Sequence, residues 1–125
     1  MGNGWKGKFR VRGEGVSEFV FNEIQDAGLQ MTGDLWTGTT TERFDAIRLS
    51  GEGQSVTEVA EFSSTVEAGT LTVTGVATFP SSARDFTTDT VALIGSSGTV
   101  IAEAPLTVEP ETTVEITRED TLSGA

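Results

Sequence analysis

Four basic side chains alternate with less polar ones in the segment WKGKFRVR, residues 5–12. An extended strand sends successive side chains to opposite faces. The basic face holds Lys6, Lys8, Arg10 and Arg12, and the apolar face holds Trp5, Gly7, Phe9 and Val11. A face of this kind can bind carboxylates, and it is attached to a chain whose formal net charge is −11.

Two interpretations of this strand remain open. Its lysines and arginines can be the solvated side of an edge strand, where they discourage unwanted pairing. They can also meet a carboxylate-rich partner or the acidic body of a neighbouring copy, which would fix the register of docking. We favour the second and predict a docking strand in which the apolar face supplies most of the binding energy, because salt screens charge. The predicted interface residues are Trp5, Lys6, Lys8, Phe9, Arg10, Val11 and Arg12.

Catalytic candidates are few, because the chain has no histidine and no cysteine. Imidazole and thiolate chemistry is thereby excluded. Asp85 and Asp89 lie near Arg84 and resemble the paired carboxylates of a hydrolase. We expect them instead to polarise a turn before a strand that begins at Thr90. The sequence therefore predicts a protein that is not an enzyme.

Metal and cofactor sites are not predicted either. A cation could be shared by acidic residues near the C-terminus, namely Glu109, Glu111, Glu115 and Asp120. No ligand loop with the regular spacing of a calcium site accompanies them, so we expect a solvated acidic face. The segments Gly13-Glu14-Gly15 and Gly51-Glu52-Gly53 are not followed by the lysine or helix start of a phosphate loop, and we expect turns there.

The two tryptophans, Trp5 and Trp36, could stack on sugars. We expect Trp36 to lie in the core at the end of a helix's apolar face, and we leave the role of Trp5 open.

The composition fits one acidic domain, residues 1–125, with residues 1–12 as a basic strand or arm. Nineteen acidic against eight basic residues are typical of proteins that work in high salt, although an ordinary acidic protein remains the alternative. Nucleic acid is a poor partner for such a body. No segment is apolar enough for membrane insertion.

One short helix is predicted over about residues 23–37. Ile24, Ala27, Met31 and Leu35 recur at helical spacing. Asn22 can cap the helix and Gly38 can end it.

The rest of the chain has the pattern of antiparallel strands. Valine, threonine and isoleucine are concentrated in residues 44–49, 56–66, 70–79, 90–94, 99–106 and 112–117. Alternation such as Val114 and Ile116 against Thr113 and Glu115 gives one packed and one wet face. The predicted fold is mainly β, an antiparallel sandwich or small barrel with one short helix.

The order of several motifs resembles a family of small structural proteins of tailed phages and viruses. The motifs are NEIQDAGLQMTGDLWTG, then FDAIRLSGEG, then TVALIGSSGTVIAEAPLTV, and finally TTVEITRED, within residues 22 to about 120. Ser50 stands where the family usually has glycine, and the basic strand is no part of the motif. Together with the acidic composition, the resemblance implies a tailed virus of halophilic archaea.

The resemblance implies a function as a virion structural protein. The chain would be a repeated subunit of the capsid surface or of a tail or baseplate appendage, assembled in the host cytoplasm. Its partners would be other virion proteins and further copies of itself, with a trimer favoured over a pentamer. The alternative is a receptor- or glycan-binding module at a fibre tip or cell surface.

Overall fold

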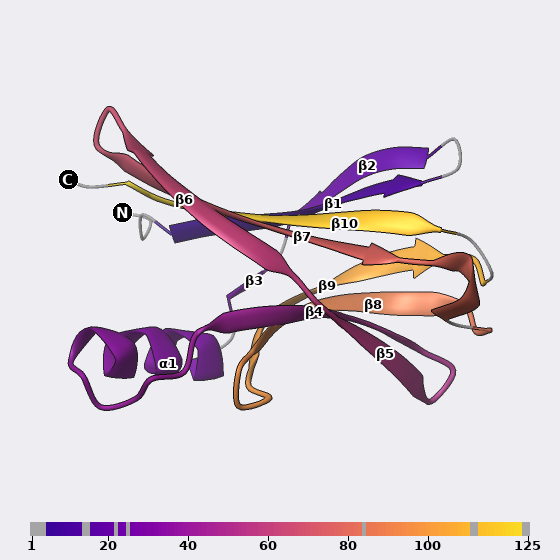
Figure 1. The fold of residues 1–125 in the computed structure, drawn as a ribbon, viewed down its shortest axis with the longest axis horizontal. Helices are drawn as coiled ribbons and strands as arrows, with labels where there is room; N and C mark the ends of the chain where they lie inside the picture. Colours follow the sequence, from indigo (N-terminus) through magenta and orange to yellow (C-terminus); the bar gives the residue numbers. More distant parts are fainter. Residues whose placement is uncertain are drawn as a thin grey trace.

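Two antiparallel β-sheets face each other, and a single helix lies at one end of them (Figure 1). The computed structural model describes residues 5–13, 16–21, 23–24, 26–83, 85–110 and 113–123. The first sheet has five strands in the order β2 (Val16–Phe21), β1 (Trp5–Gly13), β10 (Val114–Ser123), β7 (Thr70–Phe79) and β6 (Glu61–Glu67). The second has the order β3 (Glu23–Ile24), β9 (Val100–Val108), β8 (Thr88–Gly95), β4 (Phe44–Gly51) and β5 (Gln54–Val59). The prediction of a mainly β fold with one helix is confirmed, in its sandwich form.

The chain passes from one sheet to the other along both sides of the sandwich. Consecutive strands β5 and β6 are the edges of the two sheets on one side, and β2 and β3 are the edges on the other. The single strand predicted over residues 56–66 is therefore two strands in different sheets. They part at Ala60, which is buried and whose N–H donates to the carbonyl of Asp45 at 3.0 Å.

The core lies between the inner faces of the two sheets. Strand alternation brings Phe9, Phe79 and Ile116 inward from the first sheet and Ile47, Leu93 and Ile101 inward from the second, all with no exposed surface. The strand β9 shows the pattern clearly, since Ala104, Leu106 and Val108 are buried and the residues between them are exposed. A core built from both faces is what holds the sheets together.

The helix α1 (Asp26–Trp36) is shorter than the predicted range of residues 23–37, because Glu23 and Ile24, expected at its start, form the strand β3 instead. Among the helix side chains that the structure describes, Met31 is the one that enters the core. Gly28 allows the helix to lie close to β9, because a Cβ at this position would lie 2.5 Å from the carbonyl oxygen of Ile101. Gly38 has a φ of +76°, which ends the helix as expected. The predicted cap, Asn22, lies outside the described residues.

The turn predicted at residues 51–53 is confirmed, whereas Asp89, expected in a turn before a strand starting at Thr90, lies inside β8. Between β4 and β5, Glu52 and Gly53 have φ angles of 51° and 73°, which suits a tight hairpin. Glu14 and Gly15 of the other predicted turn lie outside the described residues. None of the helical segments that the structure describes is long and apolar enough to cross a membrane. A short 3₁₀ helix, η1 (Ser81–Ala83), connects toward β8.

Candidate functional site

The predicted docking strand is an interior strand of the first sheet. Residues 5–13 of β1 pair with β10, and residues 8–13 also pair with β2. Along residues 8–13 both edges of the strand therefore make backbone hydrogen bonds within the chain. Strand addition to a partner cannot use this stretch, and the alternative of an edge strand does not apply to it either.

The apolar face of β1 packs inside the protein. Phe9 and Val11 are 0% and 2% exposed and belong to the core, and Trp5 is half-buried against it. In the folded chain these residues stabilise the sandwich itself. The interface prediction consequently rests on the outer face of the strand, where it stays a prediction.

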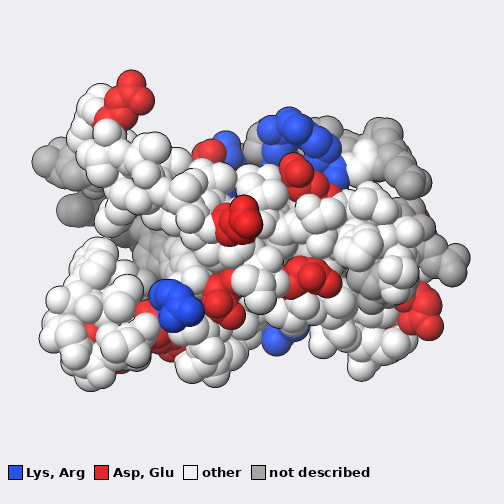
Figure 2. Space-filling model, viewed as in Figure 1, with Lys and Arg blue, Asp and Glu red and all other residues white. Residues whose placement is uncertain are grey.

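The basic face of β1 lies beside acidic residues of β10. Lys6 and Arg12 are exposed, and Lys8 and Arg10 are half-buried. Lys8 stands opposite Glu119 and forms an ion pair with it at 3.4 Å. Figure 2 shows Lys and Arg gathered along the side of the molecule where Figure 1 places β1. Lys8 of the basic face therefore neutralises an acidic side chain of the neighbouring strand within the same sheet.

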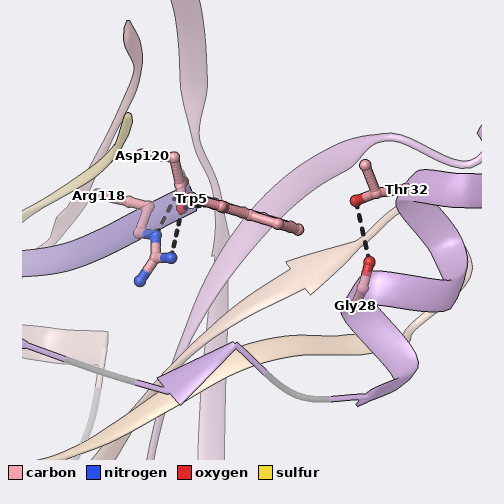
Figure 3. A network of polar contacts seen from close by, with 5 residues as sticks. All are labelled: Trp5, Gly28, Thr32, Arg118 and Asp120. Atoms are coloured by element: carbon pink, nitrogen blue, oxygen red, sulfur yellow. Dashed lines mark hydrogen bonds and ion pairs between the residues drawn. The ribbon is translucent and has the colours of Figure 1, made fainter. Parts of the chain in front are cut away.

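A buried ion pair, between Arg118 and Asp120, lies on the inner face of β10 (Figure 3). The Arg118 guanidinium donates to Asp120 from Nε at 2.9 Å and from Nη2 at 2.5 Å, and the two residues are 0% and 5% exposed. Trp5 Nε1 donates to the same carboxylate at 2.9 Å. The guanidinium also stands 4.7 Å from the centre of the Phe9 ring. The carboxylate and the aromatic face together compensate a fully buried charge.

Two glycines make room for large side chains on this inner face. A Cβ on Gly7 would collide with the guanidinium of Arg118, and a Cβ on Gly75 would collide with the ring of Phe62. Gly75 stands directly opposite Arg118 on β7. Phe62 and Arg118 therefore lie across the neighbouring glycines, and any side chain there would displace them.

An apolar cavity of about 230 Å³ opens between α1 and the end of the first sheet. Its apolar lining includes Trp5, Met31, Leu35, Trp36, Phe44, Leu71 and Leu122, and its polar lining is Thr32, Arg43, Asp120 and Thr121. The rings of Trp5 and Phe44 stack with centroids 6.5 Å apart. This cavity brings the two tryptophans of the chain to one site.

The expectation that Trp36 lies in the core is wrong. Its side chain is 70% exposed, at the rim of the cavity. Met31 sits one turn and more earlier and is only 4% exposed. Trp36 is the last residue of α1, and at this end the helix extends beyond the core that buries Met31.

A second polar cluster ties the β8–β9 turn to the segment before β4. Glu42 accepts hydrogen bonds from the Ser97 hydroxyl, from Ser97 N at 3.2 Å and from Thr99 Oγ1 at 3.1 Å. Desolvation works to raise the pKa of Glu42, but these hydrogen bonds outweigh it and hold the pKa below its usual value of 4.5. The cluster anchors a turn, since each donor belongs to that turn.

The other candidate carboxylates do not converge, and Asp120, expected on a solvated acidic face, is buried at 5% exposure. Asp85 and Asp89 are exposed, and Asp89 accepts from the Thr90 hydroxyl at 2.9 Å just inside β8. Arg84 and Glu111 lie outside the described residues. Within the described part of the chain, no group of three or more acidic side chains is arranged to hold a metal ion.

One edge of the first sheet is open in the residues that the structure describes. There β6 pairs with β7 alone, and all of its residues except Phe62 are exposed. Val66 stands opposite Leu71, so both point to the inner face, yet Val66 is 75% exposed. Sequence reasoning missed this edge because it joined β5 and β6 into one strand.

The fold and these sites define a β-sandwich with an apolar cavity at one end and an open sheet edge. No family model, no curated protein and no solved structure matches the chain.

Proposed function

We propose that the protein is a non-enzymatic structural protein, a repeated subunit of a virus particle. Its place is the capsid surface or a tail or baseplate appendage. It assembles in the host cytoplasm with other virion proteins and with further copies of itself. The order of motifs between residues 22 and 120 supports the viral part of this proposal. The geometry supports the part that concerns self-association.

The observation that carries self-association is the edge strand β6. The outer backbone groups of an edge strand are a template for pairing with another chain. The sequence of β6, EFSSTVE, has neither lysine nor proline, the residues that commonly protect such an edge. Val66 adds an exposed apolar side chain to it. We assign this edge to a second copy of the chain.

High salt favours this mode of association over one based on charge. Backbone hydrogen bonds and apolar contacts persist where exposed charges are screened. The exposed basic residues Lys6 and Arg12 then add specificity by meeting the acidic surface of the neighbour. A trimer is favoured, and a pentamer is the alternative; either ring requires β6 to meet a different surface of the neighbouring copy, since two paired β6 edges would close a dimer.

The proposal is tested by the solution mass of Val66→Lys, which puts an edge-protecting charge on β6. Val59→Lys is the matched control, because Val59 is 74% exposed and lies on β5, the edge of the other sheet. Loss of the oligomer in the first variant alone supports assembly through β6.

The second candidate is a receptor- or glycan-binding module, and Trp36 favours it. An exposed tryptophan at a cavity rim is a stacking platform for a sugar ring. Quenching of tryptophan fluorescence by host surface sugars, lost in Trp36→Ala, would support this function. Unchanged emission with all sugars would argue against it.

A further inference from the structure

We propose that the cavity between α1 and the first sheet binds a small amphipathic anion, a molecule with an apolar body and a negatively charged head. This inference does not depend on the assembly role of β6, whose residues do not line the cavity. The size of the cavity, the chemistry of its walls and one charged side chain support it.

The cavity volume sets the size of the apolar body. A buried apolar cavity of roughly 150 Å³ accommodates the six carbons of benzene. At the same packing, the 230 Å³ found here corresponds to roughly nine carbons. The walls suit such a body, since two indole rings, Phe44, Leu71 and Leu122 face it.

Most polar groups at the cavity already have partners. The carboxylate of Asp120 accepts from Arg118 and from Trp5, so its charge is compensated. The Thr32 hydroxyl donates to the carbonyl of Gly28 at 2.9 Å (Figure 3). These groups therefore offer a ligand few polar contacts. The charge of the ligand's head group must be selected by another residue.

Arg43 selects for a negatively charged head group on the ligand. It lines the cavity and is exposed, and no ion pair joins its guanidinium to another residue in the part of the chain that the structure describes. An uncompensated cation beside an apolar cavity complements a carboxylate, sulfate or phosphate head.

Octanoate is the first probe, compared with octan-1-ol and octylammonium, which carry the same chain with a neutral and a positive head. Both tryptophans line the cavity, so their fluorescence reports occupancy without a label. We expect octanoate to bind about fifteenfold more tightly than hexanoate, since each of its two additional methylenes contributes about fourfold when buried. We expect a preference of about two- to fivefold over octan-1-ol at low salt, decreasing in molar salt, because the head contact is exposed.

Three variants test the site. Leu35→Glu puts a like charge at the mouth and should weaken octanoate binding about tenfold or more. Leu29→Glu is its control, because Leu29 is on the same helix, is 44% exposed against 40% for Leu35, and does not line the cavity. Arg43→Gln should remove the preference for octanoate over octan-1-ol and leave octan-1-ol binding unchanged.

The proposal is overturned by any of three results. The first is no change in tryptophan emission with octanoate. The second is equal or tighter binding of octylammonium, which would contradict the anionic head. The third is equal loss of binding in the Leu29→Glu and Leu35→Glu variants, which would place the ligand elsewhere. Calorimetry on the same variants gives an independent measure of each affinity.

Discussion

The guanidinium of Arg118 occupies the space that a Cβ of Gly7 would need. Gly7 faces inward on β1 between Trp5 and Phe9, and Arg118 reaches it from the neighbouring strand β10. A charged side chain thus replaces an apolar one in the inner layer of the sandwich. Its partner Asp120 stands opposite Gly7 and lines the cavity at the end of the sheet.

Gly7→Ala should destabilise the protein by about 1–3 kcal/mol, because overpacking displaces the buried guanidinium. Gly33→Ala is the control, since nothing lies within 4 Å of a Cβ there and alanine favours a helix. That variant should gain about 0.5–1 kcal/mol. Chemical unfolding of both in molar salt measures the difference, and equal stabilities would contradict the packing described for Gly7.

Asp120→Ala should cost about 3–5 kcal/mol, because it leaves the Arg118 charge buried without its carboxylate. The double variant Arg118→Met with Asp120→Ala should recover part of that loss, since no charge then remains in the core. A double-mutant cycle by chemical unfolding gives the coupling. A double variant less stable than Asp120→Ala alone would refute the pairing.

Glu42→Gln should lower the melting temperature near neutral pH and leave it unchanged in acid. The pKa of Glu42 is lower in the folded protein than its usual value of 4.5, so the stabilisation is complete above that value. It is lost as the pH falls through the folded-state pKa, where both states become protonated. Thermal unfolding of wild type and variant from pH 7 to pH 3 should show the two curves converge. A constant difference would contradict this role.

Met31→Ala should cost about 2 kcal/mol or more, because Met31 is 4% exposed in the core. Trp36→Ala, at the last residue of the same helix and 70% exposed, should change the free energy of unfolding by less than about 0.5 kcal/mol. The pair is compared by chemical unfolding. A large loss from Trp36→Ala would restore the expectation that it lies in the core.

The fold was largely predictable because the alternation of apolar and polar residues along each strand is visible in the sequence. The alternation of Phe9 and Val11 with arginines placed β1 correctly as a strand with one buried face. The break at Ala60 was not visible, since valine and threonine continue on both sides of it. Only the tertiary structure assigns the two halves to different sheets.

The sites were less predictable, because they depend on which strands become neighbours. In β10 the inward positions continue from Val114 and Ile116 through Arg118 and Asp120, and Leu122 resumes the apolar pattern. That return of an apolar residue is a signal that the charged pair faces inward. The open edge of β6 has no such signal, since an edge is defined by the order of strands in the sheet.

The most direct test of the central proposal is the mass by light scattering in molar salt of wild type, Val66→Lys and Val59→Lys. Removal of residues 1–12 is unsuitable, because it would delete Phe9 and Val11 from the core. The proposal predicts a discrete oligomer for wild type and Val59→Lys and a monomer for Val66→Lys. A folded monomer for all three proteins would contradict self-assembly through β6.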